Sequence, residues 1–119
     1  MEQCPFCNPK RFEHDVIFTT EHFIFFRDYK PIAPGHSLLI PSFHIRSESE
    51  IPDAYHAEYW EANAKAYEWI GKTYTYDPLV FINPPHQQSV THLHKHFIPG
   101  VFGVLGVDEA LREFLKTKK

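Results

Sequence analysis

The chain of 119 residues has few cysteines, little net charge and no long apolar run. Its formal net charge of -3 argues against polymeric nucleic acid as a ligand. No apolar run approaches the ~18 residues that a membrane-spanning helix needs, so we expect no membrane association. The first residues lack the basic stretch and apolar core of a signal peptide. We therefore expect a cytoplasmic protein whose two cysteines, Cys4 and Cys7, do not form a structural disulfide.

What the chain does contain is enough apolar material for one compact core, because 43% of its residues are hydrophobic and 16% are aromatic. No repeat or linker divides it, so we expect a single domain over residues 1–119. Runs of β-branched and aromatic residues predict strands at 16–19, 22–27, 37–40 and 79–82. A long helix is expected over 52–74, and a short one over 108–115 with Asp108 as its N-cap. Strands, then a helix, then strands indicate an α+β domain with an antiparallel sheet.

Three histidines alternate with other residues in the segment His92-Leu93-His94-Lys95-His96. In an extended strand, side chains at alternate positions share one face, so the spacing predicts a strand that presents three imidazoles together. Lys95 would face the other side, toward the long helix, where an unpaired buried lysine is costly. We expect Lys95 to reach a sheet edge or to meet an acidic partner.

This segment resembles the histidine triad (HIT) superfamily, whose pattern is His-φ-His-φ-His-φ-φ with φ apolar; only Lys95 departs from it. Further similarity lies in Phe26-Arg27-Asp28, in residues 34–45, in Asn83 and in Gln88-Ser89-Val90. Cys4-Pro5-Phe6-Cys7 resembles the Cys-x-x-Cys of many bacterial members. The resemblance covers about residues 4–100. It implies a five-stranded antiparallel sheet with one long helix and a short C-terminal helix, in a homodimer.

The resemblance also implies an activity, which is hydrolysis at the α-phosphate of nucleoside phosphoramidates or dinucleoside polyphosphates. His94 would be the nucleophile and would form a nucleotidyl-histidine, with the backbone carbonyl of His92 accepting a hydrogen bond from its other nitrogen. His96 and Ser89 would assist at the phosphoryl group, and backbone N–H groups around 87–89 would add donors. The implied nucleotide-binding residues are Phe6, Phe26, Asp28, Tyr29, Asn83, Gln88, Ser89, His94 and His96.

Other interpretations remain open. A nucleotide-binding module with little or no turnover is favoured by Lys95 and by the loop 85–87, where hydrolases of the family usually carry glycines. A strand that binds metal through all three histidines is a further possibility, although the matches at Asp28 and Ser89 argue against it. The transferase branch of the superfamily is discounted because its distinctive triad differs from this one. The remaining histidines, His36 included, are interpreted as ordinary surface or core residues.

Cys4 and Cys7 form a Cys-x-x-Cys pair that has two interpretations. A redox motif needs a strand before it and a helix start after it, whereas no strand precedes Cys4 and Pro9 soon follows. The pair is otherwise half of a tetrahedral zinc site. By resemblance, the other ligands would be His44 and His92, and the zinc would be structural. Two reduced thiols without a metal are the alternative.

Overall fold

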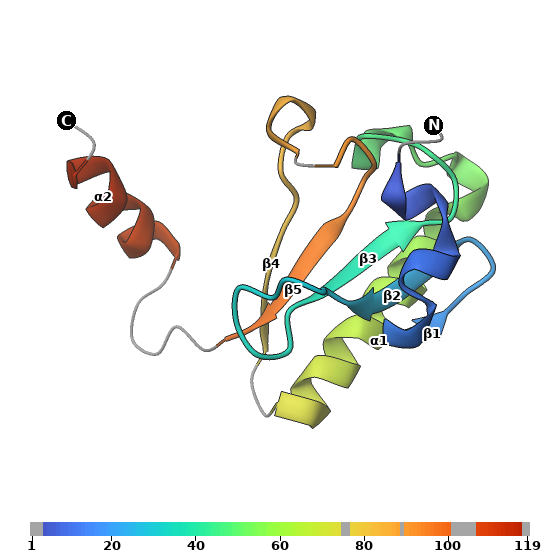
Figure 1. The fold of residues 1–119 in the computed structure, drawn as a ribbon, viewed down its shortest axis with the longest axis horizontal. Coiled ribbons are helices and arrows are strands. Elements are labelled where there is room, and N and C mark those ends of the chain that lie inside the picture. Colours follow the sequence, from blue (N-terminus) through green and yellow to red (C-terminus); the bar gives the residue numbers. More distant parts are fainter. Residues whose placement is uncertain (1–3, 75–76, 89, 101–106, 118–119) are drawn as a thin grey trace.

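A computed structural model of the protein describes residues 4–74, 77–88, 90–100 and 107–117. Five strands form one antiparallel sheet in the order β1-β2-β3-β5-β4 (Figure 1). The strands are β1 (Val16–Thr19), β2 (Phe23–Arg27), β3 (Ser37–Pro41), β4 (Pro78–Phe81) and β5 (Lys95–Pro99). The predicted α+β class and the five-stranded antiparallel sheet are confirmed.

The helices also follow the prediction closely. The long helix α1 (His56–Tyr74) covers one face of the sheet and follows a short 3-10 turn, Asp53–Tyr55, that occupies the start of the predicted range. The C-terminal helix α2 (Val107–Thr117) begins before Asp108, so Asp108 lies in the first turn and is not the N-cap. An acidic side chain there still lies at the positive end of the helix dipole. No helix among the described residues is long and apolar enough to cross a bilayer.

Residues 23–26 of β2 and 38–41 of β3 are apolar without interruption because the sheet is covered on both faces. Phe23 and Phe25 of β2 enter the core under α1. Their neighbours Ile24 and Phe26 enter a second core on the opposite face, together with Phe12 of the N-terminal segment. Since alternate side chains of a strand point to opposite faces, a strand that is covered twice carries apolar residues at every position.

Strand β5 departs from this rule because it carries polar side chains on both faces. Lys95 points to the α1 face, as predicted, and is only 8% exposed. Its Nζ donates to Asn63 Oδ1 at 2.6 Å and to Tyr59 Oη at 3.4 Å, and it lies 3.5 Å from Glu48 Oε2. Burial lowers the pKa of Lys95, and the charge of Glu48 opposes that shift. The expected acidic partner therefore exists, and it comes from the same chain.

Removal of the Lys95 ammonium should destabilise the protein, because Asn63 Oδ1 would lose its hydrogen-bond donor inside the core. We expect Lys95→Met to lower the free energy of unfolding by about 2 kcal/mol, measured by urea denaturation. Adding Asn63→Leu should recover part of this loss, since it removes the orphaned amide. As a control, Lys72→Met removes an exposed lysine paired with Glu68 and should cost less than about 0.5 kcal/mol. If Lys95→Met and Lys72→Met both lower the free energy of unfolding by the same small amount, the buried hydrogen bonds of Lys95 do not stabilise the fold.

Candidate functional site

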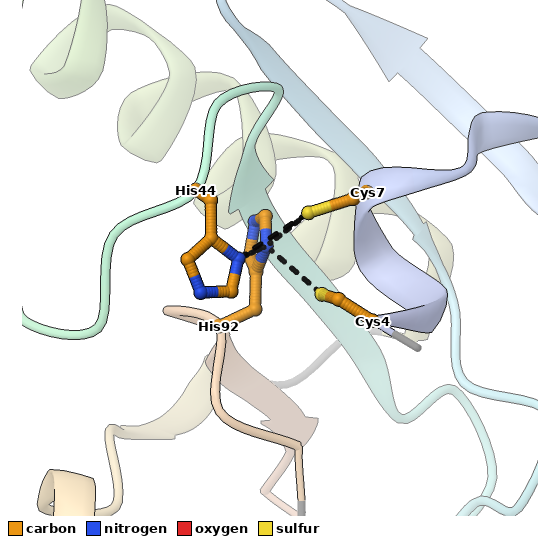
Figure 2. A group of neighbouring side chains, drawn as sticks. All are labelled: Cys4, Cys7, His44 and His92. Atoms are coloured by element: carbon orange, nitrogen blue, oxygen red, sulfur yellow. Dashed lines mark hydrogen bonds between the residues drawn. The ribbon is translucent and has the colours of Figure 1, made fainter. Parts of the chain in front are cut away.

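Four side chains from three distant segments converge beside the sheet (Figure 2). Cys4 and Cys7 come from the N-terminal 3-10 turn, His44 follows β3, and His92 precedes β5. Their ligand atoms all lie within 4.8 Å of one another. The structure thus brings together the four residues for which the sequence predicted a zinc site.

Four of the six distances between these atoms match the edges of a tetrahedron. Zinc bonds of about 2.3 Å to sulfur and about 2.0–2.1 Å to nitrogen imply edges of roughly 3.3–3.8 Å. His92 Nδ1 lies 3.4 Å from Cys4 Sγ, 3.5 Å from Cys7 Sγ and 3.3 Å from His44 Nδ1. The distance from His44 Nδ1 to Cys7 Sγ is 3.3 Å. One imidazole nitrogen makes a single hydrogen bond, yet His92 Nδ1 faces three possible partners. Hydrogen bonding alone does not account for this arrangement, whereas a tetrahedral zinc ion between the four atoms fits it.

His92 fixes the orientation of His94 as well. Its Nε2 donates to the Pro41 carbonyl at 3.0 Å, and because a carbonyl only accepts, the Nδ1 of neutral His92 keeps a lone pair for the cluster. The carbonyl of His92 in turn accepts from His94 Nδ1 at 2.7 Å, which leaves a lone pair on His94 Nε2. This is the hydrogen bond that the resemblance implied. Burial lowers the pKa of His94, which favours the neutral form that a nucleophile requires.

A further buried histidine, His36, sets the opposite tautomer in His96. The backbone N–H of Ile32 donates to His36 Nδ1 at 3.0 Å, so neutral His36 carries its proton on Nε2. That nitrogen lies 2.9 Å from His96 Nδ1 and 3.4 Å from Asp28 Oδ2. With Nδ1 accepting, His96 carries its proton on Nε2. Within the part of the chain that the structure describes, this buried Nε2 has no partner, so its N–H is free to meet a ligand.

Gly35 places His36 at the start of β3. Its φ of +85° lies in the left-handed region, which favours glycine. A Cβ atom at this position would lie 2.6 Å from the ring of Tyr74 and 2.7 Å from the side chain of Pro99. Any larger residue would therefore displace the turn that carries His36.

The imidazoles of His94 and His96 line a cavity of about 250 Å³ on the face of the sheet opposite α1. Its lining includes three aromatic rings and five polar side chains, namely Phe6, Phe26, Tyr29, Asp28, Lys30, His36, His94 and His96. A second cavity of about 370 Å³ shares the same aromatic rings and extends past Arg11 and Asp15. Flat rings beside a carboxylate and two neutral imidazoles suit the base, ribose and phosphate of a nucleotide.

Burial controls the charge of this site. It lowers the pKa of His96 to about 3, and the neighbouring His94 and His36 act in the same direction. Burial also lowers the pKa of His36, although Asp28 opposes the shift. The cavity therefore presents neutral imidazoles near pH 7, one with a lone pair and one with an N–H.

Residues 10–103 match the family model of the HIT domain. The chain belongs to the HIT family. Protein hit of Bacillus subtilis is 31% identical over 105 residues, which are 82% of this chain and 71% of that protein. Adenosine 5'-monophosphoramidase HNT1 of Saccharomyces cerevisiae is 32% identical over 83 residues, which are 70% of this chain and 52% of that protein. The solved structure of a HIT family hydrolase from Clostridium thermocellum is 26% identical, with a TM-score of 0.71 over 90% of this chain and 98% of that one. These matches support a hydrolase at the level of the family.

Not all the nucleotide-binding residues predicted for this HIT protein lie in the smaller cavity. Phe6, Phe26, Asp28, Tyr29, His94 and His96 line it. Asn83 and Gln88 are not in its lining. The Gln88 side chain donates instead to the backbone carbonyls of Asn83 at 3.3 Å and Arg46 at 2.8 Å. Ser89 lies outside the described residues.

The strand of three histidines is shorter than expected. Strand β5 begins at Lys95, so His92 and His94 lie in the segment that leads into it. The N–H of His92 donates to the carbonyl of Val90, and this local turn interrupts the extended backbone. As a result, the His92 ring contributes to the cysteine cluster, whereas the rings of His94 and His96 remain neighbours with centroids 5.0 Å apart.

The sequence interpretation missed His36. This residue is 2% exposed and is bonded to His96, so it is more than an ordinary core residue. The pairing of β3 with β5 brings the two together, because Leu38 lies opposite His96. The available signal was the position of His36 in the family-like segment 34–45, directly before a predicted strand.

The depressed pKa of His96 predicts a loss of stability in acid. His96 takes up a proton near pH 6.5 in the unfolded chain but only near pH 3 in the folded chain. Its contribution to the free energy of unfolding is therefore fully present above pH 6.5 and is lost as the pH falls toward 3. The free energy of unfolding should fall by about 1.4 kcal/mol per pH unit below pH 6 from His96 alone. In urea denaturation at pH 7.5, 6 and 5, the free energy of unfolding should depend less steeply on pH in His96→Asn than in the wild type, by the contribution of about one proton. His14→Asn, at an exposed position, is the control, and equal slopes in all three proteins would refute the assignment.

Proposed function

We propose that this protein is a nucleotide hydrolase that cleaves at the α-phosphate of nucleoside phosphoramidates or dinucleoside polyphosphates. It would release a nucleoside monophosphate through a covalent nucleotidyl-histidine at His94. One observation carries the proposal. The Nε2 lone pair of His94 and the Nε2–H of His96, which has no partner among the described residues, belong to residues that line the same cavity as Asp28. The relative named adenosine 5'-monophosphoramidase adds support for the substrate class.

In the first step, His94 Nε2 attacks the α-phosphorus, and a phosphorus–nitrogen bond forms as the bond to the leaving group breaks. The N–H of His96 donates to a non-bridging phosphoryl oxygen and stabilises the charge that develops there. The leaving group takes up a proton from solvent as it departs, a step in which the resemblance assigns a role to Ser89. The imidazole of His94 carries the positive charge in the intermediate, and its Nδ1–H stays on the His92 carbonyl.

In the second step, water attacks the same phosphorus, releases one proton to solvent, and the bond to His94 breaks. The nucleoside monophosphate leaves, and His94 returns to its neutral state with the Nε2 lone pair restored. Asp28 accepts hydrogen bonds from the ribose hydroxyls, because a carboxylate offers only acceptors. Phe6 and Phe26 contact the base through their faces and edges, which tolerates different bases.

A nucleotide-binding module without turnover is the alternative, and the structure weakens one of its supports. Lys95 is bonded to residues of the α1 face, away from the cavity, so its charge does not occupy the phosphate site.

The loop Pro85–Gln87 forms a 3-10 turn in which the N–H groups of Gln87 and Gln88 donate to Pro84 and Pro85 carbonyls. These two amides are therefore already used and are not the additional phosphate donors that the sequence suggested.

We also propose that Cys4, Cys7, His44 and His92 hold a zinc ion. The tetrahedral spacing supports this, as does the hydrogen bond from His92 Nε2 to Pro41, which leaves Nδ1 as the ligand atom. Because four protein ligands complete the coordination, the ion would be structural and would offer no position for substrate.

The His94→Asn variant tests the nucleophile. Asparagine retains an N–H that can donate to the His92 carbonyl, but it has no counterpart of the Nε2 lone pair. With adenosine phosphoramidate or a diadenosine polyphosphate as substrate, AMP release followed by chromatography should fall at least ~1000-fold. Acid quenching of the wild type during turnover should trap an adenylylated protein that the variant does not form.

His14→Asn is the matched control and should leave turnover unchanged, since His14 is exposed. AMP binding, measured by calorimetry, should persist in His94→Asn. If wild type and His94→Asn bind AMP equally and neither releases it from either substrate, the binding-module interpretation replaces the hydrolase.

We further propose that the protein is a homodimer joined through β4 and α1. Strand β4 lies at the edge of the sheet, where it leaves backbone groups unpaired, and it packs beside α1. Helix α1 also exposes the aromatic side chains of Trp60 (60%) and Tyr67 (43%).

If the protein is a dimer, light scattering should give twice the 14.0 kDa of one chain. Tyr67→Glu should shift the mass to that of a monomer, whereas Tyr29→Glu on the other face should not, and a monomeric wild type would refute the proposal.

A further inference from the structure

Phe6 connects the cysteine cluster to the nucleotide cavity. It lies in the 3-10 turn Pro5–Cys7, between the two cysteines of the cluster. The centroid of its ring is 5.2 Å from that of His94, 5.9 Å from that of His92 and 5.8 Å from that of Phe26. Phe6 also lines both cavities. One side chain therefore touches the nucleophile, a cluster histidine and the wall for the base.

The turn that carries Phe6 cannot hold this position alone. Its backbone bonds, from Cys7 N to Cys4 O at 3.2 Å and from Asn8 N to Pro5 O at 3.3 Å, close the turn on itself. They fix its shape but do not attach it to the sheet, and isolated 3-10 turns have little intrinsic stability. Attachment comes from the cysteine sulfurs, which face His44 and His92, and from the packing of Phe6 itself.

We propose that the zinc clasp formed by Cys4, Cys7, His44 and His92 builds the nucleotide pocket by holding Phe6 against His94. Nucleotide affinity is then set by metal occupancy, with Phe6 as the side chain that transmits it. The inference rests on the proposed nucleotide site but adds a role for the cluster that the hydrolytic steps do not require.

The effect of metal loss should be confined to the turn. Without an ion, the two thiols and two imidazole nitrogens are not held together at tetrahedral spacing, so the turn loses the attachment that its sulfurs provide and keeps only the packing of Phe6. Further along, Phe12 stays in the core, where its ring stacks on Phe26 at 4.1 Å. His92 also keeps its hydrogen bond to Pro41, and His94 keeps its bond to the His92 carbonyl. Binding should therefore weaken while the nucleophile keeps its tautomer, which raises KM with little change in kcat.

The experiment is a cycle of four states, with wild type and Phe6→Ala each measured zinc-loaded and zinc-stripped. Zinc content is measured by metal analysis, and AMP affinity by calorimetry. Stripping zinc from wild type should weaken AMP binding about tenfold, the size expected for loss of one aromatic contact to a base. Zinc-loaded Phe6→Ala should show a similar loss. Stripping that variant should add less than about twofold, because the two changes act through one contact.

Two further measurements separate a local effect from a general one. Cys7→Ser should bind AMP like the stripped wild type and should not respond to added zinc. Hydrogen exchange should show that stripping exposes the amides of residues 4–8, while those of β2 and β5 remain protected. Loss of protection throughout the domain would overturn the proposal, since zinc would then be a general requirement for folding.

The remaining outcomes are equally decisive. Failure of the wild type to bind zinc overturns the clasp and leaves the hydrolase proposal intact. If AMP affinity does not change when zinc is removed, or if it falls equally in wild type and Phe6→Ala, then Phe6 does not transmit the effect of zinc. That result overturns this inference and leaves the zinc site and the hydrolase proposal intact. Failure of the zinc-loaded wild type to bind AMP overturns the proposed function, and this inference falls with it.

Discussion

The site depends on His92, because both ring nitrogens and the carbonyl of this residue have different partners. Its Nδ1 faces the cysteine cluster, its Nε2 donates to the carbonyl of Pro41, and its own carbonyl accepts from His94. These partners come from the N-terminal turn, from the end of β3 and from the segment that leads into β5, so they fix the orientation of the His92 ring. The cysteine cluster and the proposed nucleophile are thereby joined within two residues, which explains how the N-terminal turn comes to line the cavity of His94 and His96.

Strand β5 separates two polar systems that would interfere if they shared a face. His96 belongs to the cavity, while Lys95 points to α1 and is bonded to Asn63. Burying a lysine is expensive, and the cost is offset only because the helix and the loop before it supply an amide oxygen and a carboxylate. The departure from the family pattern at Lys95 is thus accommodated by residues of this chain, Asn63 and Glu48, and leaves the cavity face unaltered.

Local patterns in the sequence were sufficient for the sheet and the long helix, because strands covered on both faces appear as continuous apolar runs such as residues 23–26. Contacts between distant segments were not accessible in this way. The bond between His36 and His96 arises from the pairing of β3 with β5, and the Glu48 partner of Lys95 is 47 positions away. The cysteine cluster could be predicted only through the resemblance, since Cys4 and Cys7 by themselves allow a redox pair, a metal site or free thiols.

The chemical capacity of the cavity follows from two imidazoles held in opposite tautomers. His94 donates from Nδ1 to a carbonyl, so its Nε2 has a lone pair; His96 accepts at Nδ1 from His36, so its Nε2 has a proton. Burial keeps both neutral, which prevents either from losing its assigned character near pH 7. One side-chain type thus supplies a nucleophile and a hydrogen-bond donor side by side. What distinguishes them is only the partner at Nδ1, a backbone carbonyl in one case and the Nε2–H of His36 in the other.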